Sequence, residues 1–88
     1  MFVVLMYDVG EKRVAKYLKL MRRYLTHIQN SVFEGEITEG KLRELRHQIE
    51  KLMKEDEDSV IIYKFENTKY TERIDMGLTK PKNSDIII

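Results

Sequence analysis

Two short apolar runs, at residues 2–7 and 60–63, decide which architectures are open to this chain of 88 residues. Both runs are rich in β-branched and aromatic side chains, and polar residues do not alternate with the apolar ones along them. Continuous runs of this length are typical of strands that are covered on both faces. The fold must therefore place a layer on each side of a sheet.

Two segments between these runs have helical spacing. The first apolar stripe consists of Val14, Leu18, Met21 and Leu25, widened by Tyr17 and Tyr24. The second consists of Leu42, Leu45, Ile49 and Leu52. Both repeats match one face of an amphipathic helix. His27 falls where the first helix is expected to end, a favourable place for a cation, and Thr38 is the expected N-cap of the second helix.

The remaining strands are shorter. The segment HIQNSVFEGEIT predicts one broken strand or two short ones, with Asn30 and Ser31 as the interruption. Tyr70, Ile74 and Met76 predict a further strand near the C-terminus. The resulting order predicts an α+β fold, a ferredoxin-like βαββαβ sandwich. Its four-stranded antiparallel sheet carries two helices on one face, plus a C-terminal strand.

Two helices can cover only one face of such a sheet, although the main strands are apolar on both. We therefore predict a homodimer that packs through the open sheet faces. Residues 1–78 form the expected domain, and residues 79–88 form a C-terminal tail. The terminal isoleucines, Ile86 to Ile88, either add a strand to the partner's sheet or belong to a disordered tail, and the sequence leaves both open.

The composition narrows the chemistry. Without cysteine, the chain can form neither a disulfide nor a thiolate metal site. No apolar stretch reaches the roughly 20 residues of a membrane span, and no signal-peptide pattern opens the chain, so we expect a cytoplasmic protein with no membrane partner.

The net charge is only +1, but the cations are unevenly distributed. Residues 11–25 contain a single acid, Glu11, and six cations: Lys12, Arg13, Lys16, Lys19, Arg22 and Arg23. This pattern predicts a nucleic-acid-binding surface that contacts phosphates. The alternative is an ordinary solvated helix face.

Asp8 stands at the exit of the first strand, and two roles compete for it. It can cap the following helix, since Asp8 and Glu11 have the spacing of a capping box. It can also hold a metal ion for catalysis. If a dimer axis runs near the first strands, two copies of Asp8 face each other, and a divalent cation such as Mg²⁺ relieves their repulsion. Such a site can activate water or polarise a phosphodiester.

Other candidate sites are weaker. His27 and His47 form no paired motif, and Glu34 and Glu36 are more simply explained as an exposed strand face. The nucleotide-binding glycine motifs and the nucleophile elbow are absent from the sequence.

A family resemblance covers nearly the whole chain. The strand ending in Tyr7-Asp8-Val9, the basic helix and the segment Gln29-Asn30-Ser31-Val32-Phe33-Glu34-Gly35-Glu36 resemble the second CRISPR-associated core protein, as do Asp58-Ser59-Val60-Ile61-Ile62-Tyr63 and Met76-Gly77. The resemblance implies a ferredoxin-like homodimer for spacer acquisition, with Asp8 as the shared metal-linked aspartate. It also implies that Tyr7, Ser31 and Phe33 lie near the active centre. After Asp8, many relatives are richer in arginine than the GEKR found here.

The resemblance implies two roles. One is a DNA-binding adaptor that bridges dimers of the CRISPR-associated integrase. The other is a magnesium-dependent endonuclease that acts on single-stranded RNA or duplex DNA. A toxin-type ribonuclease dimer and a ligand-sensing regulatory dimer are the alternatives, because a fold alone does not determine function.

Overall fold

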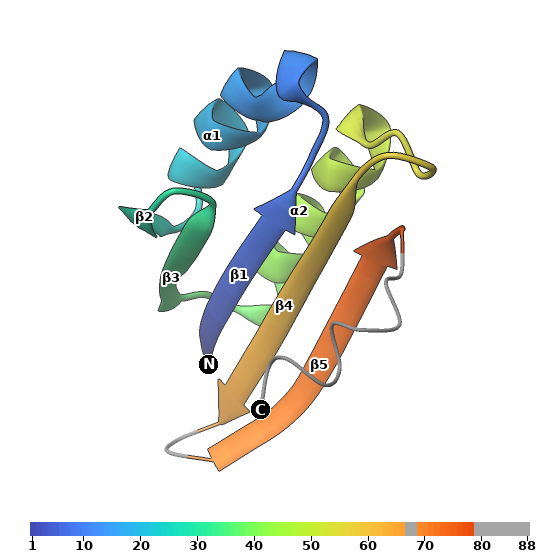
Figure 1. Ribbon diagram of the computed structural model, residues 1–88. Coiled ribbons are helices and arrows are strands. Elements are labelled where there is room, and N and C mark those ends of the chain that lie inside the picture. The colour runs from blue at the N-terminus through green and yellow to red at the C-terminus, as the bar shows by residue number, and fades with distance from the viewer. Residues whose placement is uncertain (67–68, 79–88) are drawn as a thin grey trace.

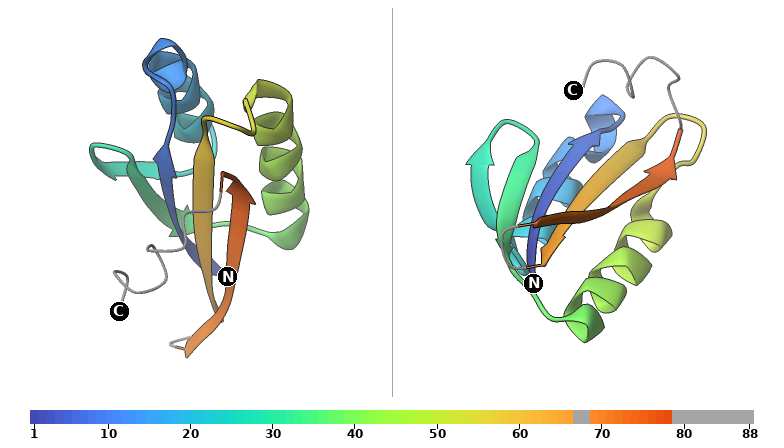
Figure 2. Two further views of the ribbon diagram at one scale, coloured as in Figure 1. Left: turned by 45° about the vertical axis from the view of Figure 1, so that its right-hand side comes forward. Right: turned by 90° about the horizontal axis from the view of Figure 1, so that it is seen from below.

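The protein folds around one antiparallel sheet of five strands in the order β2-β3-β1-β4-β5. The computed structural model describes residues 1–66 and 69–78. The strands are β1 (Phe2–Asp8), β2 (Thr26–Gln29), β3 (Val32–Glu36), β4 (Ser59–Glu66) and β5 (Lys69–Gly77). The helices are η1 (Glu11–Arg13, a short 3-10 helix), α1 (Val14–Arg22) and α2 (Glu39–Leu52). Figure 1 and the two views of Figure 2 show α1 and α2 on the same face of the sheet.

This arrangement confirms the predicted α+β class. The strands β2, β3, β1 and β4 form the predicted four-stranded sheet, and the C-terminal strand β5 extends it by pairing with β4 of the same chain. The predicted interruption between β2 and β3 is also confirmed. Asn30 lies there with a positive φ of 41°, a conformation that asparagine tolerates better than most residues. Residues 79–88, on which we placed a possible partner strand, lie outside the described part of the chain.

The two faces of the sheet differ in how well they are covered. In β1, Val3, Leu5 and Tyr7 face the helices and are buried in the core. The alternate residues Phe2, Val4 and Met6 are only half-buried. The same alternation holds along the middle of β4, where Ile61 and Tyr63 fall on the open face and are half-buried. The helices therefore cover one face, and a cover for the other stays a prediction.

The first helix is shorter than predicted, but much of its predicted stripe is buried: Tyr17 and Met21 within the helix, and Leu25 just beyond it. It ends at Arg22, and its buried residues are Tyr17, Leu20 and Met21, whereas Val14 is 40% exposed. The hydroxyl of Tyr17 donates a hydrogen bond to Asp58 over 3.0 Å and so anchors the helix. His27 does not end this helix. It lies in β2, and its ring stacks on Phe33 at 4.7 Å between centroids.

The second helix follows its prediction. Leu42, Leu45 and Ile49 are buried against the sheet. Thr38 is the N-cap, and its hydroxyl oxygen accepts a hydrogen bond of 3.1 Å from the backbone N–H of Lys41. The cap satisfies one of the N–H groups that a helix leaves without a partner at its start.

Candidate functional site

Asp8 is the last residue of β1, and its side chain is exposed. In the register of the sheet it lies opposite Ser59, the first residue of β4. Since side chains alternate along a strand, Asp8 shares the open face of the sheet with Val4 and Met6. The N-cap of η1 is Gly10, two residues after Asp8, so Asp8 does not occupy the N-cap position that the predicted capping box with Glu11 requires.

The three motif residues Tyr7, Ser31 and Phe33 gather at this end of β1. The backbone N–H of Tyr7 donates to the carbonyl oxygen of Ser31 over 3.1 Å. The Tyr7 ring stacks on Phe33 with a centroid distance of 6.1 Å and on Tyr17 with one of 5.3 Å. Tyr7 and Phe33 are buried on the helix face, so they support the strand end beneath Asp8.

The electrostatics of Tyr7 agree with a supporting role. Burial raises the pKa of its hydroxyl, and the charge of Arg22 acts in the opposite direction. The hydroxyl therefore stays neutral around pH 7. Its position in the aromatic stack, between Tyr17 and Phe33, favours packing as its contribution to the site.

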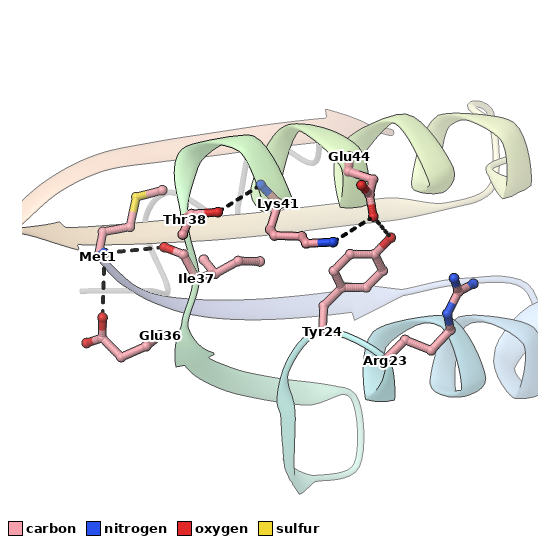
Figure 3. Close-up of a pocket in the computed structure, with 8 residues that line it drawn as sticks. All are labelled: Met1, Arg23, Tyr24, Glu36, Ile37, Thr38, Lys41 and Glu44. Carbon is pink, nitrogen blue, oxygen red and sulfur yellow. Dashed lines mark hydrogen bonds and ion pairs between the residues drawn. The ribbon is translucent and has the colours of Figure 1, made fainter.

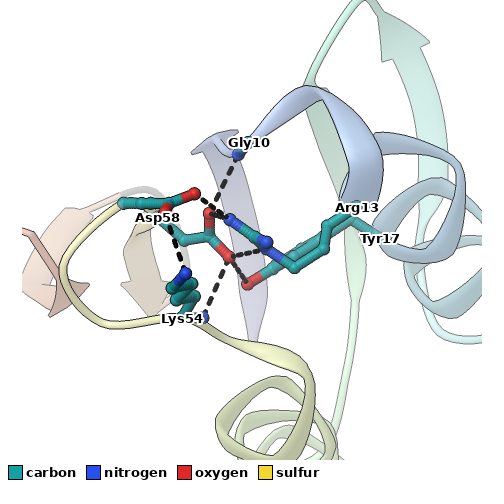
Figure 4. A network of polar contacts seen from close by, with 6 residues as sticks. Gly10, Arg13, Tyr17, Lys54 and Asp58 are labelled. Atoms are coloured by element: carbon teal, nitrogen blue, oxygen red, sulfur yellow. Dashed lines mark hydrogen bonds and ion pairs between the residues drawn. The ribbon is translucent and has the colours of Figure 1, made fainter.

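A second aspartate, Asp58, organises the loop that follows Asp8. Its side chain is fully buried and accepts five hydrogen bonds (Figure 4). The donors are Gly10 N at 2.9 Å, Arg13 Nε and Nη2 at 2.7 Å each, Tyr17 Oη at 3.0 Å and Lys54 N at 3.1 Å. We call Asp58 and these four donor residues the Asp58 network. It ties β1, η1 and α1 to the turn that connects α2 with β4.

The network keeps Asp58 ionised. The hydrogen bonds from Arg13 are the main cause that holds the pKa of this carboxyl well below its usual range, and burial acts in the opposite direction. The same contact with Asp58, together with Glu57, raises the pKa of Arg13. Burial first, and then the hydrogen bond to Asp58, raises the pKa of Tyr17. The buried charge is thus paired and fully hydrogen-bonded, which is how a folded protein tolerates one.

Two glycines leave room for this arrangement. A Cβ atom on Gly10 would clash with Arg13 Nη2 and would lie 3.2 Å from Glu57 Oε1. Gly77, at the end of β5, has a φ of 84°, and a Cβ there would clash with the carbonyl oxygen of Asp58. That oxygen also accepts a hydrogen bond of 2.7 Å from Leu78 N. The side chain and the backbone of Asp58 therefore both serve as anchors.

Sequence reasoning missed this network because Asp58 closes the acidic run EDED, which looks like a solvated turn. One signal was present. Arg13 lies four residues before Tyr17, so the two side chains lie on the same side of a helical segment. Because Tyr17 belongs to the apolar stripe, a cation beside it is expected to pair with an acid.

The predicted cations separate into two groups. Lys12, Lys16, Lys19, Arg22 and Arg23 are exposed. Arg13 differs, because its guanidinium is held by Asp58 at 2.7 Å and by Glu57 at 2.9 Å. Because Arg13 is paired with acids of its own chain, it does not belong to the nucleic-acid surface proposed below.

A single chain offers few metal ligands. In residues 1–66 and 69–78, no group of three or more His, Asp or Glu side chains is close enough to hold a metal ion together. Glu36 is exposed and pairs with the N-terminal amino group at 3.5 Å. Mg²⁺ needs only one or two protein carboxylates, with water and substrate phosphate as its other ligands. An exposed Asp8 fits that requirement, provided that a second chain supplies the second carboxylate.

Within the part of the chain that the structure describes, no helix is long and apolar enough to cross a membrane.

Comparison with known proteins identifies the family. The model of the family described as CRISPR associated protein Cas2 matches residues 1–73. The chain belongs to the Cas2 family. Among its relatives is the CRISPR-associated endoribonuclease Cas2 of Dictyoglomus turgidum, which is 48% identical over 87 residues, covering 99% of this chain and 100% of the relative. The Thermotoga maritima protein of the same name is 43% identical over 86 residues, covering 98% of this chain and 99% of the relative.

The fold of this Cas2 chain also matches solved structures. The crystal structure of Streptococcus pyogenes Cas2 superimposes with a TM-score of 0.69 at 30% sequence identity, covering 75% of this chain and 87% of that one. Family membership confirms the resemblance drawn from Asp8 and the QNSVFEGE segment. It favours the CRISPR role over the toxin-type ribonuclease and the ligand-sensing dimer.

Proposed function

We propose that this Cas2 protein acts in CRISPR spacer acquisition as a nucleic-acid-binding homodimer, with a magnesium-dependent phosphodiesterase site formed by Asp8 from both copies. The observation that carries the proposal is the placement of Asp8. It is an exposed carboxylate at the end of β1, on the open face of the sheet. The relatives from Dictyoglomus turgidum and Thermotoga maritima are named endoribonucleases, which supports single-stranded RNA as a substrate.

The homodimer follows from the uncovered sheet face. Phe2, Val4 and Met6 of β1 and Ile61 and Tyr63 of β4 lie there half-buried. Packing two such faces against each other removes their apolar surface from water, which stabilises the dimer. The same packing brings both copies of β1 near a common axis, and the two Asp8 side chains approach each other at the strand ends.

The division of labour in the site follows from the contacts. Asp8 supplies the carboxylate, and the hydrogen bond between Tyr7 and Ser31 fixes the backbone immediately before it. The hydrogen bond from Gly10 to Asp58 fixes the backbone that follows. When bound, Mg²⁺ would polarise the phosphodiester and activate a water molecule. The exposed cations of α1 bind the substrate backbone.

A second role is the bridging of integrase dimers in the capture of DNA. It is favoured by the exposed cations Lys12, Lys16, Lys19 and Arg22, which form no ion pair within the described residues. Cations without acidic partners contact phosphates in a sequence-independent manner. In this role the protein holds DNA, and its function survives the loss of Asp8.

The decisive experiment is cleavage of labelled single-stranded RNA and duplex DNA, with and without Mg²⁺, by the wild type and by Asp8→Asn. The Asn side chain keeps the size of Asp and removes its charge. We expect the variant to remain dimeric by light scattering and to lose magnesium-dependent cleavage. Equal cleavage by both proteins would refute the catalytic role of Asp8. If neither protein cleaves while both bind DNA and the integrase, the bridging role stands alone.

A further inference from the structure

The helices α1 and α2 lie side by side on one face of the sheet, opposite the open face that carries Asp8 (Figure 1 and Figure 2). The two helices are antiparallel neighbours: Tyr24, just after α1, donates a hydrogen bond of 2.7 Å to Glu44 in the first half of α2. Near the other end of α1, Lys16 and Leu20 share a pocket of about 300 Å³ with Gln48, Lys51 and Leu52 of α2. We call this the interhelical pocket.

Two further pockets are lined by residues near the two helices, and both contain acidic side chains beside their cations. The first, shown in Figure 3, is lined by Arg23, Lys41 and the N-terminal amino group, together with Glu36 and Glu44. Here Lys41 pairs with Glu44 at 3.7 Å. The second contains Arg13 and Lys54, which pair with Glu57 at 2.9 Å and 3.0 Å.

The interhelical pocket differs from both. Two lysines line it, and no carboxylate does. Within the part of the chain that the structure describes, neither Lys16 nor Lys51 forms an ion pair. The pocket thus combines two unbalanced positive charges with the amide of Gln48, while Leu20 and Leu52 provide apolar surface. An anion placed there gains attraction from both lysines and repulsion from no lining side chain.

We propose that the interhelical pocket binds the phosphodiester backbone of a nucleic acid strand. Lys16 and Lys51 contact phosphate oxygens, the Gln48 amide donates a further hydrogen bond, and the two leucines pack against the sugar. This inference rests on the proposed nucleic-acid-binding function and extends it to α2, because Lys51 and Gln48 lie outside the basic segment 11–25. Lysines act here as point charges and contain no planar fork for reading bases, so the contact is independent of sequence.

The location has a consequence for the dimer. If two copies pack through their open sheet faces, both helix layers face outward, and each carries one interhelical pocket. The nucleic acid is then held on the outside of the dimer, whereas the two Asp8 side chains meet near its axis. Backbone binding and metal chemistry therefore use different residues, and Asp8→Asn can lose cleavage while it still binds nucleic acid.

The test compares Lys51→Gln with Lys41→Gln. Both lysines are exposed on α2, but Lys41 already has a carboxylate partner. Binding of fluorescently labelled 30-base-pair DNA and 30-nucleotide RNA is measured by anisotropy from 50 to 300 mM salt. Loss of one phosphate contact reduces the salt slope by about 0.9 for duplex DNA and about 0.7 for single strands, and weakens duplex binding roughly fivefold to tenfold at 0.1 M salt.

We expect this loss for Lys51→Gln and for Lys16→Gln, wild-type binding for Lys51→Arg, and a smaller effect for Lys41→Gln. If Lys51→Gln binds both nucleic acids as the wild type does, the pocket assignment is wrong, although the proposed function survives. If the wild type binds neither nucleic acid, the proposed function fails as well. Binding of poly-glutamate instead would identify the pocket as a site for acidic protein segments and would also overturn the assignment.

Discussion

Asp8 and Asp58 lie at the same end of adjacent strands, but their surroundings are opposite. Asp8 pairs in the sheet register with Ser59, the residue that directly follows Asp58. Asp58 is completely buried and accepts five hydrogen bonds, whereas Asp8 is exposed. An ionised carboxylate has about four lone-pair positions for hydrogen bonds or metals. Asp58 has used its capacity within the protein, so of these two aspartates only Asp8 faces the solvent.

The comparison teaches how an exposed functional acid is held in place. The chain leaves the sheet after Asp8 and would be free to fray, because the 3-10 helix η1 begins without a side-chain cap. The Asp58 network supplies the missing restraint, since Asp58 Oδ1 accepts the N–H of Gly10, two residues after Asp8. The buried aspartate is therefore architectural, and the exposed one is the residue to which we assign the proposed chemistry.

The largest expected effect is the loss of stability in Asp58→Ala. Removal of the carboxylate leaves Arg13 Nε, the Tyr17 hydroxyl and two backbone N–H groups without their acceptor. Breaking a buried ion pair in this way costs about 3–5 kcal/mol in the free energy of unfolding. Urea denaturation followed by circular dichroism measures this loss, with Asp56→Ala in the same turn as the control. A difference of less than about 1 kcal/mol between the two variants would contradict the architectural role.

Low pH should abolish the stabilisation that Asp58 contributes, because protonation removes its charge. The pKa of Asp58 is lowered by folding, so its contribution is complete above the unfolded value of about 3.9 and is lost as the pH falls through the lower folded value. We therefore expect the stability gap between the wild type and Asp58→Asn to be constant from pH 7 to pH 5. The gap should narrow below about pH 4. A gap that already narrows near pH 6 would mean that another group dominates.

A smaller effect is expected for Tyr17→Phe. This substitution removes one donor from Asp58 and preserves the ring that stacks on Tyr7. The Arg13 and backbone hydrogen bonds remain, so the cost is about 1.5–3 kcal/mol, the range for a hydrogen bond to a charged group. Thermal unfolding measures it. Tyr24→Phe is the matched control, because the Tyr24 hydroxyl bonds Glu44 at the surface. Equal losses of thermal stability in the two variants would show that the buried hydrogen bond contributes no more than the surface one.

Those parts of the fold that depend on local patterns were predictable from the sequence. The strands β1 and β4 are continuous apolar runs, and α2 has both a clean repeat and a threonine cap at Thr38. The face of α1 was predicted in part: Tyr17 and Met21 are buried as expected, whereas Leu20 is buried and Val14 is exposed against the prediction. Counting apolar residues could not show that the Tyr17 hydroxyl bonds the buried Asp58.

The site was predictable only in part, for a reason of distance along the chain. Asp8, Tyr7, Ser31 and Phe33 belong to short motifs, and the structure brings them to one end of β1. The Asp58 network joins residues 41 to 48 positions apart, together with Lys54 four positions away, and no periodicity connects these partners. Arg13 was consequently grouped with the phosphate-binding cations. Its ion pair with Asp58 can be recognised only from the three-dimensional structure.

The response of thermal stability to Mg²⁺ tests most directly whether two Asp8 side chains share an ion. The melting temperature of the wild type and of Asp8→Asn is measured at constant ionic strength with increasing Mg²⁺. We predict that Mg²⁺ raises the melting temperature of the wild-type dimer by several degrees, because an ion bound only to the folded state stabilises it. Asp8→Asn should not respond, and without Mg²⁺ it should be at least as stable as the wild type, because the repulsion between the paired carboxylates is gone. The same Mg²⁺ response in both proteins would contradict the shared site.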